Sequence, residues 1–186
     1  KLSYAVLKEQ GYDGYLLESA PERVLQFGEG NFLRAFVDYF IDELNEKAGF
    51  NSKVVLCQPI APDLDDRFNE QEGLYTLFLR GFQDGKKINK KRVISCVSRC
   101  LNPYKDFEAV LACADNPDLR FIVCNTTEAG ITYDSSCQFN DVPAGSYPGK
   151  LTQFMYRRFQ KFGQEAGKGF IILSCEPVSY THLRAH

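Results

Sequence analysis

The feature that most constrains the fold is a short apolar strand that leads through two glycines into an amphipathic helix. Residues 23–27 are predicted to form the strand, and Gly28 and Gly30 bracket the turn. A helix is predicted over residues 31–47, because apolar residues recur every three or four positions and would form one buried face: Phe32, Leu33, Phe36, Val37, Phe40, Ile41 and Leu44. Unpaired N–H groups and the helix dipole favour a phosphate group at such a turn. The segment therefore predicts a dinucleotide site.

The glycine pattern departs from the common fingerprint G-x-G-x-x-G, since Leu33 stands where the third glycine is expected. A tight strand-to-helix turn without a ligand is the alternative. Arg34 favours the phosphate interpretation, because a cation in the first turn of a helix is unfavourable unless an anion lies nearby. The competing interpretation of Arg34 is an ion pair with Asp38 or a contact with Glu29.

Composition indicates a globular protein and disfavours several function classes. The chain has 186 residues, 44% of them hydrophobic, and a formal net charge of -2, which suffices for one domain with a real core. No apolar run reaches the roughly 18 residues of a membrane span, and the N-terminus lacks a secretory signal. We therefore expect no membrane partner, no nucleic-acid partner and a cytoplasmic location. The densest basic run, residues 86–92, is interpreted as a solvated hairpin loop.

Cysteine and histidine usage argues against metal binding and nucleophilic catalysis. Seven cysteines are spread through the chain without a C-x-x-C pair, and several lie in apolar stretches, so we expect reduced, buried thiols. The two histidines, His182 and His186, fall within the last five residues. No metal site and no Cys-His or Ser-His pair is therefore predicted.

Further elements predict an α/β fold, Rossmann-like and doubly wound, with a mostly parallel sheet and an inserted antiparallel hairpin. Residues 1–22 are expected to be irregular. Strands are predicted at 53–58, 121–124 and 169–174, the hairpin at 74–80 and 92–97, and helices at 104–114 and 150–162. Both the glycine turn and the loop 125–130 follow a strand, so they are expected to share a cleft at the carboxyl ends of the strands.

The loop after residues 121–124 carries polar groups suited to ribose and phosphate. Asn125 offers an amide, and Thr126 and Thr127 offer hydroxyls. The alternative is a capping turn in which these side chains bond nearby backbone. Glu128 is a ribose contact or a solvated carboxylate, and the sequence does not decide between them.

The acid expected to bind the adenosine ribose should lie near the end of the strand 53–58. Gln58 stands there instead, with Asp63 and Asp65 as possible substitutes. Because no arginine follows to hold a 2′-phosphate, NAD is preferred over NADP.

Several motifs in one order resemble the mannitol dehydrogenase family of NAD-dependent dehydrogenases, over roughly residues 20–176. They are QFGEGNFLRAFVDYFIDELN, QEGLYTLFLRG, NTTEAGI, YPGKLTQFMYRRF and FIILSCE. The family motif G-x-G-x-F-x-R-A falls on Gly28, Gly30, Phe32, Arg34 and Ala35, so Leu33 is normal for the family. The resemblance and the strand ends together give the predicted cofactor-binding set: Phe27, Gly28, Glu29, Gly30, Asn31, Phe32, Leu33, Arg34, Ala35, Asn125, Thr126, Thr127 and Glu128.

The resemblance implies hydride transfer between NADH and a keto sugar acid, interconverting D-tagaturonate and D-altronate in hexuronate breakdown. It also implies that the catalytic lysine lies in a C-terminal domain that this sequence does not include, so no catalytic residue is assigned here. Lys150 is interpreted as a surface residue at a helix start. Family members acting on fructuronate or mannitol, and a non-catalytic nucleotide-binding regulatory module, remain as alternatives.

The expected organisation is an N-terminal segment (1–22), a NAD-binding Rossmann-like domain (23–176) and a tail (177–186) that does not continue the family pattern and reads as foreign sequence. The oligomeric state is not predicted.

Overall fold

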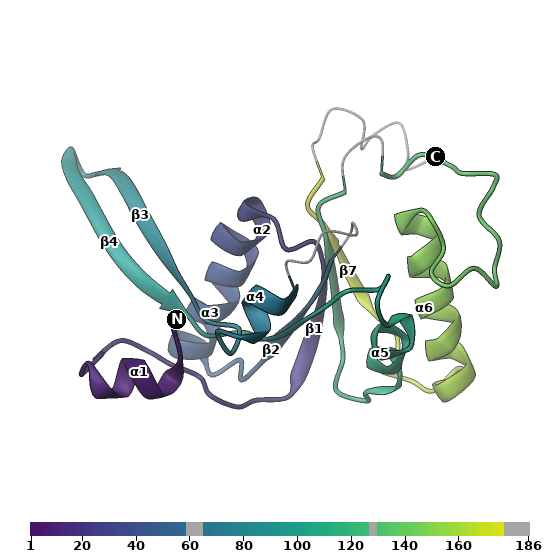
Figure 1. Ribbon diagram of the computed structural model, residues 1–186, viewed down its shortest axis with the longest axis horizontal. Helices are drawn as coiled ribbons and strands as arrows, with labels where there is room; N and C mark the ends of the chain where they lie inside the picture. The colour runs from purple at the N-terminus through teal and green to yellow at the C-terminus, as the bar shows by residue number, and fades with distance from the viewer. Residues whose placement is uncertain (59–64, 127–129, 177–186) are drawn as a thin grey trace.

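A parallel sheet forms the centre of the computed structural model, which describes residues 1–58, 65–126 and 130–176. Its strand order is β5-β2-β1-β6-β7, and a separate antiparallel pair, β3 and β4, extends away from the body (Figure 1). The strands are β1 (Glu22–Phe27), β2 (Lys53–Cys57), β3 (Tyr75–Gln83), β4 (Lys86–Ile94), β5 (Val97–Leu101), β6 (Phe121–Cys124) and β7 (Ile171–Ser174). The helices are α1 (Tyr4–Glu9), α2 (Asn31–Ala35), α3 (Val37–Ala48), α4 (Asp65–Asn69), α5 (Phe107–Ala112), a 3-10 turn (Cys113–Asp115) and α6 (Tyr147–Phe162).

Helices cover both faces of the sheet, as Figure 1 shows, with α2 and α3 on one side and α5 and α6 on the other. The alternation of side chains along β1 explains this arrangement, because Leu25 and Phe27 belong to the core under α5 and α6 while Val24 belongs to the core under α3. Every residue of β2 is buried, as expected for a central parallel strand. The predicted Rossmann-like fold class, with its inserted hairpin, is confirmed.

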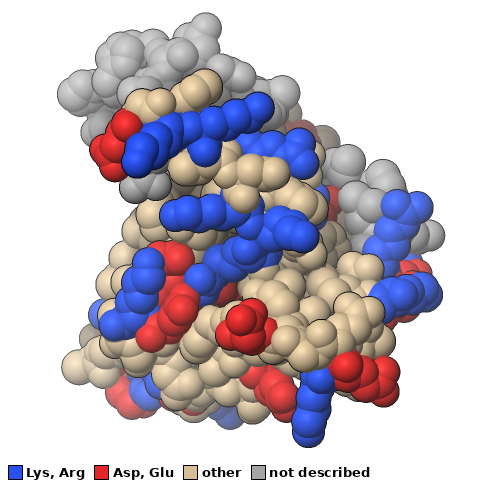
Figure 2. Space-filling view, turned by 90° about the vertical axis from the view of Figure 1, so that its left-hand side faces the viewer, with Lys and Arg blue, Asp and Glu red and all other residues tan. Residues whose placement is uncertain are grey.

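Several predicted boundaries were wrong. The segment 1–22 is not wholly irregular, since it contains α1, whose Leu7 packs against Leu74 and Val93. The strand predicted at 92–97 is split: β4 ends at Ile94, and β5 begins at Val97 and joins the main sheet. The basic run 86–92 lies within β4 rather than in a loop, and Figure 2 shows lysine and arginine gathered on this side of the molecule. The tail 177–186 lies outside the described residues, so the predicted division of the chain stays a prediction.

The predicted single buried face of the first long helix was also wrong. The helix is interrupted at Phe36, which separates α2 from α3, and of the seven apolar positions Phe32, Phe36, Phe40 and Leu44 are each about half exposed, at 46–52%. The face that α3 buries instead is partly polar: Asp38, Ile41, Asp42 and Asn45.

Hydrogen bonds account for this polar face. The Asp42 carboxylate accepts bonds from the Ser95 backbone N–H at 2.9 Å and from Arg92 Nε at 2.7 Å. The Asn45 amide exchanges two bonds with the backbone of Ser52, each 2.9 Å long. Because buried polar groups need partners, these bonds fix the rotation of α3 and leave its apolar stripe outside.

The exposed stripe of α3 lines a groove with β7, of about 550 Å³. Ile172 and Leu173 of β7 and Phe40 and Leu44 of α3 lie along it, and each is 40–50% exposed. The strand predicted as buried at 169–174 is therefore exposed, because β7 is the last strand at its edge of the described sheet.

Asp38, in the first turn of α3, is fully buried. Burial raises the pKa of its carboxyl group to about 7, although a hydrogen bond from the Tyr75 hydroxyl, 3.1 Å from Oδ2, acts in the lowering direction. Its Oδ1 has no hydrogen-bond partner among the described residues. A buried carboxylate with one unpartnered oxygen favours its neutral form.

We expect Asp38 to make the folded chain less stable as the pH rises from about 4 to about 7, since the unfolded chain releases this proton near 3.8 and the folded chain retains it to about 7. Asp38→Asn should remove this pH-dependent contribution to stability. Its free energy of unfolding, relative to wild type, should increase across that window by up to about 1.4 kcal/mol per pH unit and then level off. Urea unfolding at several pH values measures the difference.

Asp84→Asn, in the exposed turn between β3 and β4, is the matched control and should follow the wild-type curve. A constant difference between Asp38→Asn and wild type from pH 4 to pH 7 would contradict the raised pKa.

Candidate functional site

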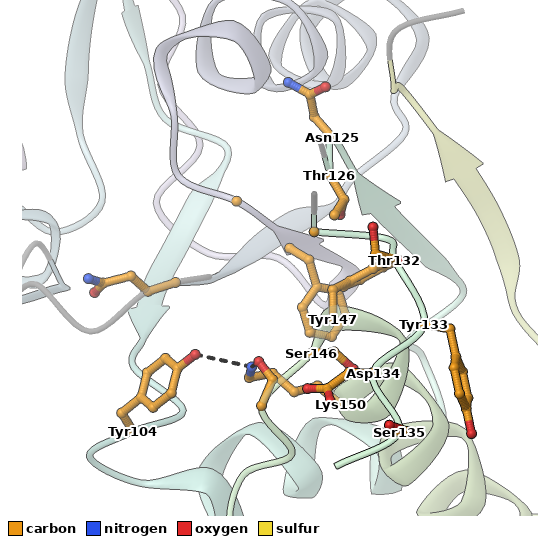
Figure 3. Close-up of a pocket in the computed structure, with 15 residues that line it drawn as sticks. Tyr104, Asn125, Thr126, Thr132, Tyr133, Asp134, Ser135, Ser146, Tyr147 and Lys150 are labelled. Atoms are coloured by element: carbon orange, nitrogen blue, oxygen red, sulfur yellow. Dashed lines mark hydrogen bonds between the residues drawn. The ribbon is translucent and has the colours of Figure 1, made fainter. Parts of the chain in front are cut away.

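A cavity of about 660 Å³ opens at the carboxyl ends of the central strands (Figure 3). Phe27 and Gly28 reach it from the end of β1, Gln58 from the end of β2, and Asn125 and Thr126 from the end of β6. The opposite wall comes from the loop 130–135, from Tyr104 and from the start of α6, with Ser146, Tyr147 and Lys150. The predicted meeting of the glycine turn with the loop after β6 is therefore seen in the fold.

Four of the predicted cofactor-binding residues line the cavity: Phe27, Gly28, Asn125 and Thr126. Two, Thr127 and Glu128, lie outside the described residues. The others are not part of its described lining and occupy the turn and the short helix α2 beside it: Glu29, Gly30, Asn31, Phe32, Leu33, Arg34 and Ala35. Their assignment to the cofactor stays a prediction.

The glycine turn has two glycines with different requirements. Gly28 has φ +128°, a conformation that side-chain-bearing residues rarely adopt, and a Cβ there would lie 3.1 Å from Leu33 Cδ1. Its N–H donates to the Cys57 carbonyl at 2.9 Å, which ties the turn to the end of β2. Gly30 has φ -64°, and a Cβ there would meet no atom within 4 Å. The described fold therefore requires glycine at position 28, whereas at position 30 it leaves open space that a side chain could enter.

The charged residues of the turn, Glu29 and Arg34, do not belong to the described lining of the cavity. Arg34 donates from Nε to the Glu29 carbonyl oxygen at 2.8 Å and from Nη2 to Asn31 Oδ1 at 2.5 Å. Its guanidinium also lies over the rings of Phe68 and Tyr75. The alternative pair with Asp38 is not formed, and the contact with Glu29 is to its backbone rather than its carboxylate. These contacts of Arg34 stabilise the conformation of the turn.

The Glu29 side chain is also nearly buried, with 7% exposure. Burial raises the pKa of its carboxyl group. Its Oε2 has no hydrogen-bond partner in the described part of the chain.

Eleven residues of the described lining were not in the predicted set, among them Gln58, Tyr104, Tyr147 and Lys150. The interpretation of Lys150 as a surface residue was wrong, since only 4% of it is exposed. The signal was present, because Ser146 caps α6 by accepting a bond from the Gly149 N–H and Pro148 marks the first turn. A helix that begins at Tyr147 rather than at Lys150 places this lysine at the level of the strand ends.

The described cysteines are free thiols, and five of them are buried: Cys57, Cys96, Cys100, Cys113 and Cys124. Burial raises the pKa of the Cys113 and Cys124 thiols to about 11, which disfavours the nucleophilic thiolate. Within the described ranges, no group of histidine, cysteine and acidic side chains is arranged to hold a metal ion, and no helix is long and apolar enough to cross a bilayer.

Comparisons with known proteins support the resemblance noted from the motifs. Residues 22–182 match the family model described as the mannitol dehydrogenase Rossmann domain. The altronate oxidoreductase of Bacteroides thetaiotaomicron is 49% identical over 158 residues, which cover 85% of this chain and 33% of that protein. The altronate oxidoreductase of Bacillus subtilis is 45% identical over 172 residues, 92% of this chain and 35% of that protein. The chain thus spans about a third of the length of these relatives.

A solved structure shares the fold. Mannitol 2-dehydrogenase of Pseudomonas fluorescens, solved as a ternary complex with NAD and D-mannitol, aligns with a TM-score of 0.76 and 21% sequence identity. The alignment covers 94% of this chain and 38% of that one.

Proposed function

The chain belongs to the mannitol dehydrogenase family, and we propose that it forms the NAD-binding part of an oxidoreductase that interconverts D-tagaturonate and D-altronate. The relatives that are 45–49% identical carry the name altronate oxidoreductase, which supports the choice of substrate within the family. Reduced thiols and an NADH-dependent reaction support a cytoplasmic location. The single observation that carries the cofactor assignment is the cavity beside Gly28.

The cavity lies at the switch point of the sheet. β1 pairs with β2 on one side and with β6 on the other. The connection from β1 to β2 passes through α2 and α3 on one face, whereas the connection from β5 to β6 passes through α5 on the opposite face (Figure 1). In open α/β sheets, ligands bind where the connections diverge in this way, at the carboxyl ends of the strands.

The lining suits a dinucleotide more than an apolar ligand. The backbone of the turn can approach a pyrophosphate closely at Gly28, which lines the cavity, and at Gly30 in the open space beside it, and Asn125 and Thr126 offer an amide and a hydroxyl to a ribose. No arginine lines the described cavity, and Gln58 is uncharged, so nothing there resembles the arginine that holds a 2′-phosphate. These residues support NAD.

Bound NADH supplies a hydride for a ketone carbon. In our proposal this chain's residues hold and orient the dinucleotide: the turn holds the phosphates, and the end of β6 positions the ribose on the nicotinamide side. The proton for the new hydroxyl group is supplied from the part of the relatives' length that this chain does not span.

We expect Gly30→Val to weaken NADH binding by at least about tenfold while leaving the thermal midpoint nearly unchanged. The reason is that the new side chain enters space that the protein leaves open and that the pyrophosphate is proposed to occupy. Isothermal calorimetry with NADH measures the change. Gly81→Val, at another glycine with open space on the distant strand β3, is the matched control and should bind NADH like wild type. Equal affinities for Gly30→Val and wild type would count against the site.

We further expect the 186-residue chain to bind NADH without turning over substrate, and the longer protein that carries this domain to oxidise D-altronate with NAD. Its kcat/KM for D-altronate should exceed that for D-mannitol at least tenfold, as measured by NADH absorbance. A preference for mannitol, or turnover by the 186-residue chain alone, would contradict the assignment.

A further inference from the structure

Lys150 is a buried cation whose described partners are all neutral. It lies in the first turns of α6 and is 4% exposed. Its Nζ donates to the Tyr104 hydroxyl and to the Gly145 carbonyl oxygen, each at 3.1 Å, and lies 5.0 Å from the centre of the Tyr104 ring (Figure 3). An ammonium carries three N–H donors, so one remains after these two bonds. Burying such a charge is costly unless an opposite charge accompanies it.

The described cavity does not supply that opposite charge. Asp134 is the one acidic residue in its described lining, and it is exposed. Its Oδ1 accepts from the backbone N–H and the hydroxyl of Ser136. No ion pair joins Lys150 to a carboxylate in the described part of the chain. The cavity therefore contains a positive charge that an anionic ligand could balance.

Lys150 lies close to the glycine turn. Gly28 and Lys150 line the same cavity. Burial raises the pKa of the Cys57 thiol well above its usual range, while Lys150 acts on it in the lowering direction and the Glu29 carboxylate of the turn in the raising direction. Cys57 ends β2 and accepts the hydrogen bond from the Gly28 N–H. Since α6 is 16 residues long and begins at the cavity wall, the positive end of its dipole adds to the same field. Arg34, in contrast, is occupied by the turn itself.

The cavity contains a second buried polar side chain, and its amide lacks partners among the described residues. Gln58 is fully buried at the end of β2, and both its Nε2 and its Oε1 have no hydrogen-bond partner among the described residues. Unsatisfied buried amides are rare and costly. A ligand with hydroxyl groups beside its phosphate, such as a ribose, would satisfy this amide and the lysine together.

We propose that Lys150 supplies the positive charge that binds the pyrophosphate of the dinucleotide, from the α6 side of the cavity. The proposal rests on the proposed function and assigns to Lys150 the role that the sequence assigns to Arg34. Ligand binding replaces or adds to the bond with Tyr104, and the ammonium then forms a charge-assisted hydrogen bond to a phosphate oxygen.

The test compares Lys150→Met with wild type by calorimetry, using NADH, ADP and adenosine as probes. Loss of one charge-assisted hydrogen bond should weaken the binding of NADH and ADP by about 10- to 100-fold and leave adenosine, which has no phosphate, unchanged. Lys150→Arg keeps the charge and should recover part of the affinity. Lys161→Met, the same substitution at an exposed position of α6, is the matched control and should bind all three probes like wild type.

The outcomes separate this inference from the proposed function. If wild type does not bind NADH, the proposed function fails. If wild type binds NADH and Lys150→Met binds it equally well, only the role of Lys150 is overturned. The same holds if Lys150→Met in the longer protein raises the KM for D-altronate and leaves the KM for NAD unchanged. If Lys150→Met weakens the binding of adenosine as much as that of NADH, the proposal is also overturned, since such a loss indicates a disturbed fold. Thermal unfolding without ligand checks the fold directly, and we expect the midpoint of Lys150→Met to lie at or above that of wild type.

Discussion

The conformation of Gly28 is the constraint on which the site depends. Its positive φ turns the chain out of β1, and its N–H extends the pairing of β1 with β2 by one more bond, to the Cys57 carbonyl. Because both strands are buried, the position of the turn is fixed by the core rather than by a ligand. The backbone beyond it, from Glu29 to Asn31, then begins α2 beside the cavity. The site is thus built on rigid elements, which is what precise positioning of a cofactor needs.

Much of the fold could be predicted from local patterns. Very apolar strands alternating with helices require a parallel sheet covered on both faces, and the glycine turn marks its first strand. What the periodicity could not show is which face of a helix is buried. In α3 the apolar stripe competes with Asp42 and Asn45, and their bonds to residues 92–95 and 52 decide the outcome. Those partners are distant in sequence, so the periodicity within the helix cannot predict these bonds.

The candidate site was predictable where it follows from strand ends and less so where it depends on a helix boundary. Gly28, Asn125 and Thr126 follow strands whose ends share one edge, so their meeting follows from topology alone. Lys150 was misjudged because a helix start three residues earlier changes the direction of its side chain and its height against the sheet. At Gln58 the sequence shows only that the carboxylate expected at the end of the strand is absent. That the Gln58 amide lacks hydrogen-bond partners among the described residues can be known only from the structure around it.

The two cations near the turn show how the fold decides between similar sequence signals. Lys150 lies near the start of α6, where the dipole disfavours a cation, whereas the break at Phe36 places Arg34 in the last turn of the short helix α2, where a cation is favoured. Arg34 is also fully engaged, by a carbonyl oxygen, an amide oxygen and two aromatic rings, none of them charged. Lys150 is more deeply buried, has fewer donors to satisfy and faces a cavity large enough for a ligand. An anion on the α6 side therefore gains a buried, preorganised charge, whereas an anion on the α2 side would have to compete with the bonds that hold the turn together.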